Sequence, residues 1–482
     1  MLDKVINNPL LNLLKNNIQL NFIYVLITGL VIAFFFFVSF YLRIELYVFL
    51  FIIALFTVLL LILYPKLWLY VTLIISGIFF HGQDEGVSIL DAITAAYYLG
   101  SVVIWFFFHT LLSRKKTAYN IGDWLILTFF LFLLLNFFVA LLNNSDLLQW
   151  LREYLLISIL LIYFPIRKLI VTEEDLKKFL IFFSFIIIGV GIYQIFLYIT
   201  KLNKIAEYAY QIKSGININQ TLYTIASTFG FVFAFYQKKF KSEILLVIFT
   251  GISIVFLIAT FSRTFWVTLA AVIIILFIFF SFKKKIKIIN YTLIISLILV
   301  GLAFIYFKDN LDLFFQIVFG RLTSTTMGTK DPSVVARLME WKEVARQITN
   351  APLYGAGLGT KFTFYFVIYE YTIHTNIIHN GFLYLIYRVG IPLSLFYFGY
   401  LIYYFILSYD NLIYSLRTSN NFLKALAISN FMGLIILFIV NFTSAQFFQR
   451  DGIVITALLT VFISLNKRFI NNNIKSNLEK LK

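Results

Sequence analysis

The sequence feature that most constrains the fold is a series of long apolar runs separated by short clusters of charge. A helix of about 20 apolar residues crosses the hydrocarbon core of a bilayer. Hydrophobic residues make up 61% of the chain and charged residues only 13%, whereas about a quarter of a typical soluble domain is charged. The pattern therefore predicts an all-α integral membrane protein with about 12–14 transmembrane helices.

Fourteen apolar runs are candidate membrane spans. They are residues 22–42, 45–64, 67–80, 88–112, 122–142, 149–166, 179–200, 221–237, 243–261, 264–282, 288–307, 380–408, 423–444 and 452–466. The third and the last are short, so twelve or thirteen spans are also compatible with the sequence. The first run is too long for the apolar region of a signal peptide and lacks a small-residue cleavage site, so we interpret it as a span.

The positions of the basic residues predict the orientation of these spans. Lysine and arginine cluster in alternate short connections, for example at 114–116, 238–241 and 283–287. Cytoplasmic loops carry such clusters in membrane proteins, so both termini are expected in the cytoplasm. The same placement explains the net charge of +17 without a nucleic-acid partner.

The predicted organisation is a single membrane domain with one large extracytoplasmic loop. Residues 1–307 would carry transmembrane helices 1–11, residues 308–378 the large loop with short helices, and residues 379–482 helices 12–14 and a cytoplasmic tail. A long ordered loop is usually functional. The chain has no cysteine and four histidines, so we expect no metal centre and no cofactor.

Three arginines near predicted spans are candidates for function, because an arginine at membrane depth is costly and usually faces a cavity or a partner. Arg263 lies in a very short turn between two apolar runs, and no acidic residue occurs within ten positions along the chain. A guanidinium there could hold a phosphate through two hydrogen bonds. Arg152 fits a substrate contact and an interfacial side chain beside Glu153 equally well. Arg388, inside the twelfth span, leaves both interpretations open.

The large loop contains one clear helix signal. Pro332 after an aspartate suits the first helical position. An apolar stripe then follows at helical spacing: Val334, Leu338, Trp341, Ala345 and Ile348. At about 100° per residue, Arg337 falls roughly 60° from the centre of this stripe and Arg346 roughly 120° from it. Arg337 is therefore the better functional candidate, and Arg346 is expected to point outward and pair with Glu343.

Two further motifs of the loop are candidates for the site. Gly355, Gly357 and Gly359 alternate along the chain, which allows either a plain turn or close approach of the backbone to a ligand. His379 and Asn380 precede the twelfth span on the same predicted side as Arg263 and Arg337. Histidine is the side chain best suited to accept a proton at neutral pH, although a lone histidine is more often structural.

Taken in order, these pieces resemble the O-antigen ligase and O-antigen polymerase superfamily of bacterial envelope polysaccharide assembly, over about residues 215–393. The matching pieces are Asn217-Ile218-Asn219-Gln220 at the start of a span, Ser262-Arg263 between two spans, Arg337 four residues before Trp341, Pro352-Leu353-Tyr354-Gly355-Ala356-Gly357, and His379-Asn380 with Leu383, Leu385 and Gly390. The resemblance implies a bacterial inner-membrane protein with a fold similar to the membrane glycosyltransferases of the C type.

The resemblance also implies an activity and roles for residues. The activity is metal-independent transfer of glycan from undecaprenyl diphosphate at the outer membrane face. Arg263 and Arg337 would bind the diphosphate, and His379 would act as, or position, the base for the acceptor hydroxyl. The polymerase pattern of an arginine, ten residues and a glycine runs from Arg346 to Gly357, but the helix geometry favours Arg337. Expected partners are the bilayer and the flippase and chain-length regulator of the same pathway.

The predicted site therefore has two classes of residue. The catalytic residues are His379 and Arg337, and the substrate-binding residues are Arg263, Arg152, Asn380, Gly355 and Gly357. We predict first a polymerase of lipid-linked repeat units. A ligase that moves finished glycan to a lipid or wall acceptor is the second prediction. The alternative of another class is a lipid-linked oligosaccharide flippase or transporter, against which the sequence lacks an internal repeat of broken helices.

Overall fold

The computed structural model describes 52, 56, 59–80, 89–204, 219–283, 285–287, 289–291, 293–294, 297, 301, 319–320, 323, 332–366, 371–375 and 377–480. The chain divides into two compact units, Met1–Leu63 and Tyr64–Lys482, and the elements below belong to the second. The predicted spans 22–42, 45–64 and 288–307 lie wholly or largely outside the described residues, as do Asn217 and Ile218.

The described elements are almost all helices. In chain order they are α5 (Pro65–Phe79), α6 (Ile89–Phe106), the π-helix η1 (Phe107–Leu112), α7 (Ile121–Leu142), α8 (Leu147–Ser158), the 3₁₀ turn η2 (Ile159–Ile162), α9 (Tyr163–Leu169), α10 (Glu173–Lys204), α12 (Gln220–Tyr236), α13 (Phe240–Ala259), α14 (Arg263–Phe279), α17 (Pro332–Ile348), β1 (Phe362–Phe366), β2 (Tyr371–Thr375), α18 (Gly381–Leu416), α19 (Asn421–Asn441), the 3₁₀ turn η4 (Gln446–Phe448) and α20 (Arg450–Lys480).

Seven helical stretches of the described part are long and apolar enough to cross a membrane. They are Ile121–Leu142, Leu147–Leu169, Glu173–Leu197, Phe240–Ala259, Gly381–Leu416, Asn421–Asn441 and Arg450–Ile474. Three shorter apolar helices, Pro65–Phe79, Ala96–Leu112 and Arg263–Phe277, accompany them. Helices are expected here because the backbone in lipid must satisfy its own hydrogen bonds. These elements confirm the predicted all-α integral membrane fold.

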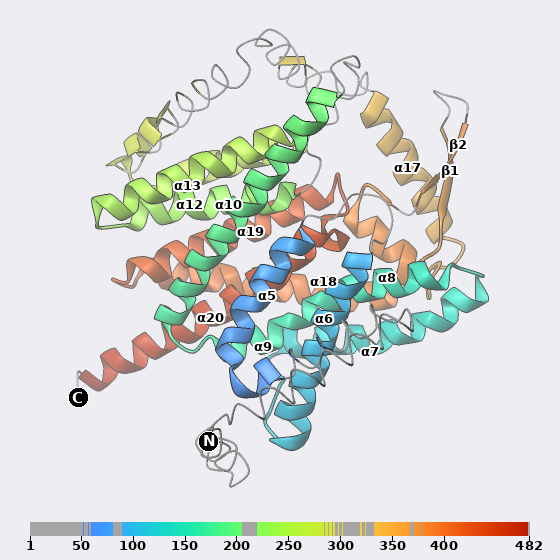
Figure 1. Cartoon of the computed structure of the whole chain (residues 1–482), viewed down its shortest axis with the longest axis horizontal. Helices are drawn as coiled ribbons and strands as arrows, with labels where there is room; N and C mark the ends of the chain where they lie inside the picture. The colour runs from blue at the N-terminus through green and yellow to red at the C-terminus, as the bar shows by residue number, and fades with distance from the viewer. Residues whose placement is uncertain are drawn as a thin grey trace, which may run out of the picture. The chain divides into compact units, whose positions relative to one another are not determined.

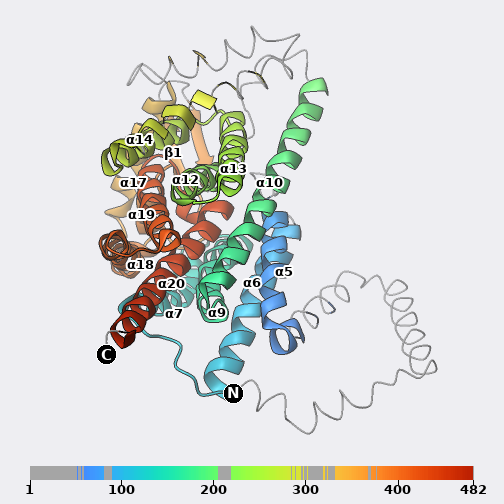
Figure 2. The ribbon, with the colours of Figure 1, turned by 90° about the vertical axis from the view of Figure 1, so that its left-hand side faces the viewer.

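The centre of the bundle is formed by α12, α19 and α20, which contact one another and lie together in Figure 2. In α19 and α20, 78% and 83% of the apolar window is buried within the protein. Helix α18 packs against α7, α19 and α20, and α10 packs against α5. Among the seven candidate spans, α19 and α20 are therefore the most buried.

Side-chain caps mark where the principal helices begin. Asn120 and Asp123 form a reciprocal capping box at the start of α7. Asp146 caps α8 by accepting hydrogen bonds from two backbone N–H groups, and Asn420 caps α19 in the same way. A cap satisfies N–H groups that have no partner within the helix, which fixes the helix ends against their neighbours.

The part of the chain between α17 and α18 contains an antiparallel hairpin that the sequence analysis did not predict. Strand β1 pairs with β2 in a register that runs from Phe362↔Thr375 to Phe366↔Tyr371. The buried rings of Phe362 and Phe364 stack on each other, and Phe362 also meets Tyr387 of α18 edge to face. Figure 1 shows α17 and the hairpin together on one side of the helix bundle.

Candidate active site

Helix α17 begins at Pro332 as predicted, but it buries a different face from the predicted apolar stripe. Leu338 is 46% exposed, whereas Glu340 and Val344 are 2% and 0% exposed. The buried face is set by the elements that α17 packs against, α18 and β1, and not by the apolar residues of α17 alone. On the observed face, Arg337 lies about 60° from Glu340 and about 20° from Val344, so it still borders the buried side.

The first turn of α17 contacts the start of α14. Arg263 is the first residue of α14, and its Nη2 donates a hydrogen bond of 3.0 Å to Oγ of Ser333. This contact brings the predicted phosphate-binding arginine onto α17, 70 positions further along the chain. Ser333 and Arg337 are four residues apart, so their side chains lie on one face of the helix.

Two turns further along, α17 contacts the segment before α18. The Glu340 carboxylate accepts from the backbone N–H of His379 at 3.0 Å, and its Oε2 lies 3.0 Å from Nδ1 of the His379 ring. Glu340 is buried, whereas the His379 side chain is 50% exposed. The indole N–H of Trp341 donates to the His379 carbonyl at 3.2 Å. His379 is therefore held to α17 by both its main chain and its ring.

The two contacts bring the predicted arginines and histidine into one row. Ser333, Arg337 and Glu340 occupy successive turns on one face of α17, and seven residues of helix span about 10 Å. Arg263 lies at one end of this row through Ser333, and His379 lies at the other through Glu340. Helix α17 thus joins two cationic side chains and a half-exposed imidazole that come from three separate parts of the chain.

Arg346 points away from this row. It forms an ion pair with Glu343 at 2.5 Å, and its side chain is 65% exposed. The hydrogen bond from Arg346 lowers the pKa of Glu343 below its usual value. This is the outward, paired position that the helix geometry predicted for Arg346.

Asn380, predicted as a substrate contact, is the N-cap residue of α18. Its Oδ1 accepts from the backbone N–H groups of Phe382 and Leu383, both at 3.0 Å, and so caps α18. Its Nδ2 donates to the carbonyl of Phe442 at 3.3 Å, and the residue is buried. The Asn380 amide is therefore engaged within the protein. Because Asn380 is the N-cap residue of α18, the neighbouring His379 ring does not cap that helix.

The glycine-rich segment approaches the protein's own backbone rather than open space. Gly355 and Gly357 are buried and have φ of +71° and +92°. A Cβ on Gly355 would lie 2.5 Å from the nitrogen of Gly390, and one on Gly357 would lie 3.1 Å from Ala140. These glycines therefore pack against the protein's own backbone, and their contact with a ligand stays a prediction.

The partner of this segment is a kink in α18. Gly390 has φ +79° and ψ 170°, which interrupts the helix and frees backbone groups. The N–H of Gly357 donates to the carbonyl of Arg388 at 2.9 Å, and the N–H of Ile391 donates to the carbonyl of Pro352 at 2.8 Å. Asn136 of α7 also donates to the Arg388 carbonyl. Irregular backbone among membrane helices requires such internal partners.

Arg152 and Arg388 differ in their surroundings. Arg152 donates to Gln149 on the same helix at 3.3 Å. Glu153, its expected local partner, instead pairs with Arg388 at 3.2 Å, and both are buried. Arg388 also donates to the carbonyl of Thr360. Arg388 therefore joins α8, α18 and the glycine-rich segment, and it lies in the structural support rather than among the half-exposed residues of the site.

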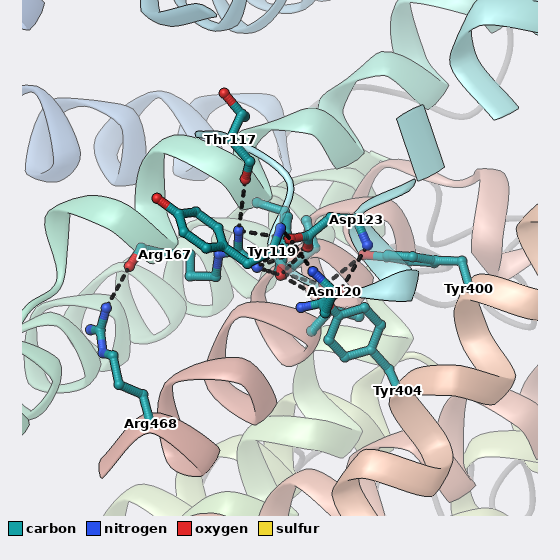
Figure 3. Close-up of polar contacts among 11 residues, drawn as sticks. Thr117, Tyr119, Asn120, Asp123, Arg167, Tyr400, Tyr404 and Arg468 are labelled. Carbon is teal, nitrogen blue, oxygen red and sulfur yellow. Dashed lines mark hydrogen bonds and ion pairs between the residues drawn. The ribbon is translucent and has the colours of Figure 1, made fainter. Parts of the chain in front are cut away.

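A second polar cluster centres on Asp123 and Arg167 (Figure 3). Arg167 donates to both oxygens of Asp123, with Nη1 2.8 Å from Oδ1 and Nη2 3.0 Å from Oδ2. Tyr163 donates to the same carboxylate at 2.8 Å and accepts from Tyr404 at 2.5 Å. The carboxylate also accepts from the backbone N–H of Tyr119. These groups satisfy one another, so the cluster fastens α7, α9 and α18 and is a poor candidate for ligand binding.

Sequence reasoning missed Glu340. An acid three residues after Arg337 could have been noticed as its neighbour on one helix face, but its partner lies 39 positions away. Within the described part of the chain, no three His, Cys, Asp or Glu side chains gather as metal ligands would. The row along α17 contains two arginines, Arg263 and Arg337, and the His379–Glu340 pair.

Comparison with protein families gives a match within the chain. Residues 246–398 match the family model described as O-antigen ligase, a range that includes Arg263, all of α17, His379 and the α18 kink. No curated protein matches the chain. The family match confirms the resemblance that the ordered motifs indicated, and it supports a glycosyltransferase-like enzyme of bacterial envelope polysaccharide assembly in a multi-pass inner-membrane protein.

Proposed function

We propose that this chain, which matches the O-antigen ligase family over residues 246–398, transfers glycan repeat units from undecaprenyl diphosphate to a growing lipid-linked polysaccharide. The reaction takes place at the outer face of the cytoplasmic membrane, with both termini in the cytoplasm. The observation that carries this proposal is the row along α17, with Arg263 at Ser333, then Arg337, then His379 at Glu340. A donor whose prenyl chain stays in the bilayer requires an enzyme that is itself resident there.

The arginine end of the row binds the donor diphosphate. Guanidinium groups pair with phosphate oxygens through two parallel hydrogen bonds. Arg263 and Arg337 supply two such groups, and the first turn of α17 adds the partial positive charge of a helix N-terminus. Stabilising the charge that develops on the leaving diphosphate accelerates cleavage of the glycosidic phosphate ester, and two cationic side chains do so without a metal ion.

The histidine end of the row receives the acceptor. The His379 ring is half-exposed and lies about 10 Å along α17 from the Arg263 contact, a separation that suits a diphosphate and its first sugar. A base at this position takes the proton of the acceptor hydroxyl as that oxygen attacks the anomeric carbon. General-base assistance of this kind contributes about 10²–10⁴ in rate.

Polymerase is the first assignment and ligase the second. The polymerase pattern from Arg346 to Gly357 supports the first, and the family description, O-antigen ligase, supports the second. The glycan profile of a deletion strain separates them. Loss of a polymerase leaves one repeat unit on the final carrier, whereas loss of a ligase leaves polymer on the prenyl lipid. The transporter alternative predicts that undecaprenyl-linked repeat units accumulate at the cytoplasmic face.

The arginines provide the direct test of donor binding. Purified Arg263→Ala and Arg337→Ala should each lose at least about 10² in transfer rate, the typical effect of removing one charge-stabilising donor. Lysine at either position should restore only part of the activity, because it cannot form the bidentate contact. Arg346→Ala is the matched control on the same helix and should be near wild type. Full activity of the Arg263→Ala and Arg337→Ala double variant would remove the proposed diphosphate site.

A further inference from the structure

Glu340 is a buried carboxylate that contacts both the main chain and the ring of His379. Its Oε1 accepts from the backbone N–H of His379 at 3.0 Å, and its Oε2 lies 3.0 Å from Nδ1 of the same residue. The side chain is 2% exposed. Burying a carboxylate is costly unless charged or hydrogen-bonding partners compensate. The main chain and the ring of His379 both supply such partners to this carboxylate.

We propose that Glu340 is the positioning residue that sets the tautomer of His379, an inference that rests on the proposed function. An ionised carboxylate only accepts hydrogen bonds, so the Nδ1 atom facing it carries the proton. The lone pair of the neutral ring is then on Nε2. Because the ring is half-exposed and its Nδ1 edge faces the buried Glu340, Nε2 is the atom available to the acceptor.

The transfer step follows with its protons accounted for. The acceptor oxygen forms its bond to the anomeric carbon of the donor while its proton moves to Nε2 of His379. The bond between the anomeric carbon and the diphosphate oxygen breaks, and its electron pair leaves with the lipid diphosphate. The ring is then an imidazolium, which the adjacent Glu340 carboxylate stabilises. Loss of the Nε2 proton to water returns the ring to its starting tautomer.

The geometry also predicts the effect of replacing Glu340 by glutamine. The amide oxygen should take the Oε1 position, because the backbone N–H of His379 requires an acceptor there. The amide NH₂ then faces Nδ1, which must become the acceptor. The ring is forced into the Nε2–H tautomer and cannot take the proton of the acceptor. Glu340→Gln therefore keeps the shape of the site and removes its base.

The test compares purified Glu340→Gln with Glu343→Gln, a control one turn along the same helix that pairs with Arg346. Glu340→Gln should lower kcat by about 10²–10⁴ and change KM for the lipid-linked donor less than about twofold. Glu343→Gln should change neither. In a His379→Ala background, Glu340→Gln should cost less than about twofold, because a residue that acts through another has no separate effect once that partner is removed.

Each other outcome has a distinct meaning. If His379→Ala is fully active, the proposed base is wrong. If His379→Ala is inactive and Glu340→Gln is near wild type, the positioning role alone is refuted. If Glu340→Gln lowers kcat equally in the wild-type and His379→Ala backgrounds, Glu340 acts on the structure of the protein and not through His379.

Imidazole ¹⁵N resonances report the tautomer of the wild-type ring directly. The chain has four histidines, and the His379→Gln spectrum identifies the signal of His379. Protonated Nδ1 is expected in the wild-type ring, and a neutral wild-type ring protonated at Nε2 would overturn the proposal.

Discussion

Replacement of Arg388 by methionine tests how the structure supports the site. Arg388 is 0% exposed, and its ion pair with Glu153, 7% exposed, measures 3.2 Å. Glu153 also accepts from the N–H of Gly359 at 3.0 Å, and Arg388 donates to the carbonyl of Thr360. Methionine fills much of the same space but leaves Glu153 as a buried charge without Arg388, with hydrogen bonds from Gly359 and Gln149 remaining. Removing one member of a buried pair costs about 3–5 kcal/mol.

The double variant Arg388→Met with Glu153→Gln separates charge from packing. A glutamine at 153 still accepts from Gly359 and no longer carries a charge, so the double variant should be more stable than Arg388→Met alone. Replacing both members of a buried pair is often close to neutral. The two substitutions should therefore be strongly non-additive. Arg346→Met is the control, because the exposed Arg346–Glu343 pair should contribute no measurable stability.

The measurement is the equilibrium unfolding free energy in mixed micelles for the wild type, both single variants, the double variant and the control. An Arg388→Met cost no greater than that of Arg346→Met would refute the support role. The support role would also be refuted if the double variant lost as much unfolding free energy as the two single variants lose together. Either result would mean that the glycine-rich segment is held to the α18 kink by its backbone hydrogen bonds alone.

Three further predictions concern packing, capping and orientation. Gly355→Ala should destabilise the protein by at least about 1–2 kcal/mol, because φ is +71° and the new Cβ would meet backbone. The control Gly189→Ala, in a helix with open space around it, should be neutral or stabilising. Equal effects of the two substitutions in unfolding assays would refute the packing role of Gly355. Asn380→Ala should cost about 0.5–2 kcal/mol of stability through loss of a helix cap, with little change in KM for the donor. Asn380→Asp should restore the stability. A raised KM at unchanged stability would instead show that Asn380 contacts the substrate. A topology reporter fused at Lys283 should read cytoplasmic and one at Asn350 extracytoplasmic, and the same side for both would contradict the orientation.

The parts of the fold that local pattern determines were predictable. Apolar runs indicated the membrane helices, since each run is long enough by itself to cross the bilayer. Pro332 fixed the start of α17, and the positions of Arg346 and Glu343 on that helix indicated their ion pair. In each case the determining residues lie within one element, so spacing alone carries the information.

The parts that depend on distant partners were not predictable. Glu340 interrupts no apolar stripe and resembles a solvated acid, yet it is buried because His379 reaches it from outside the helix. The glycine spacing predicted a turn or close approach to a ligand, and in the structure the glycine-rich segment approaches another part of the chain. The surface approached, the α18 kink at Gly390, lies more than thirty positions away. The hairpin that pairs Phe362 with Thr375 likewise lacks a two-residue turn signal, and short helices were expected there instead.

The central claim is that His379 serves as a base beside an arginine-bound diphosphate, in a site that works without a metal ion. The most direct measurement is transfer from a purified lipid-linked donor in the presence of EDTA, with wild type and His379→Gln side by side. Glutamine keeps hydrogen bonds but cannot accept the proton. The wild type should turn over unchanged in EDTA, and His379→Gln should lose about 10²–10⁴ in rate. Near-normal turnover by His379→Gln, or loss of wild-type activity in EDTA, would contradict the mechanism.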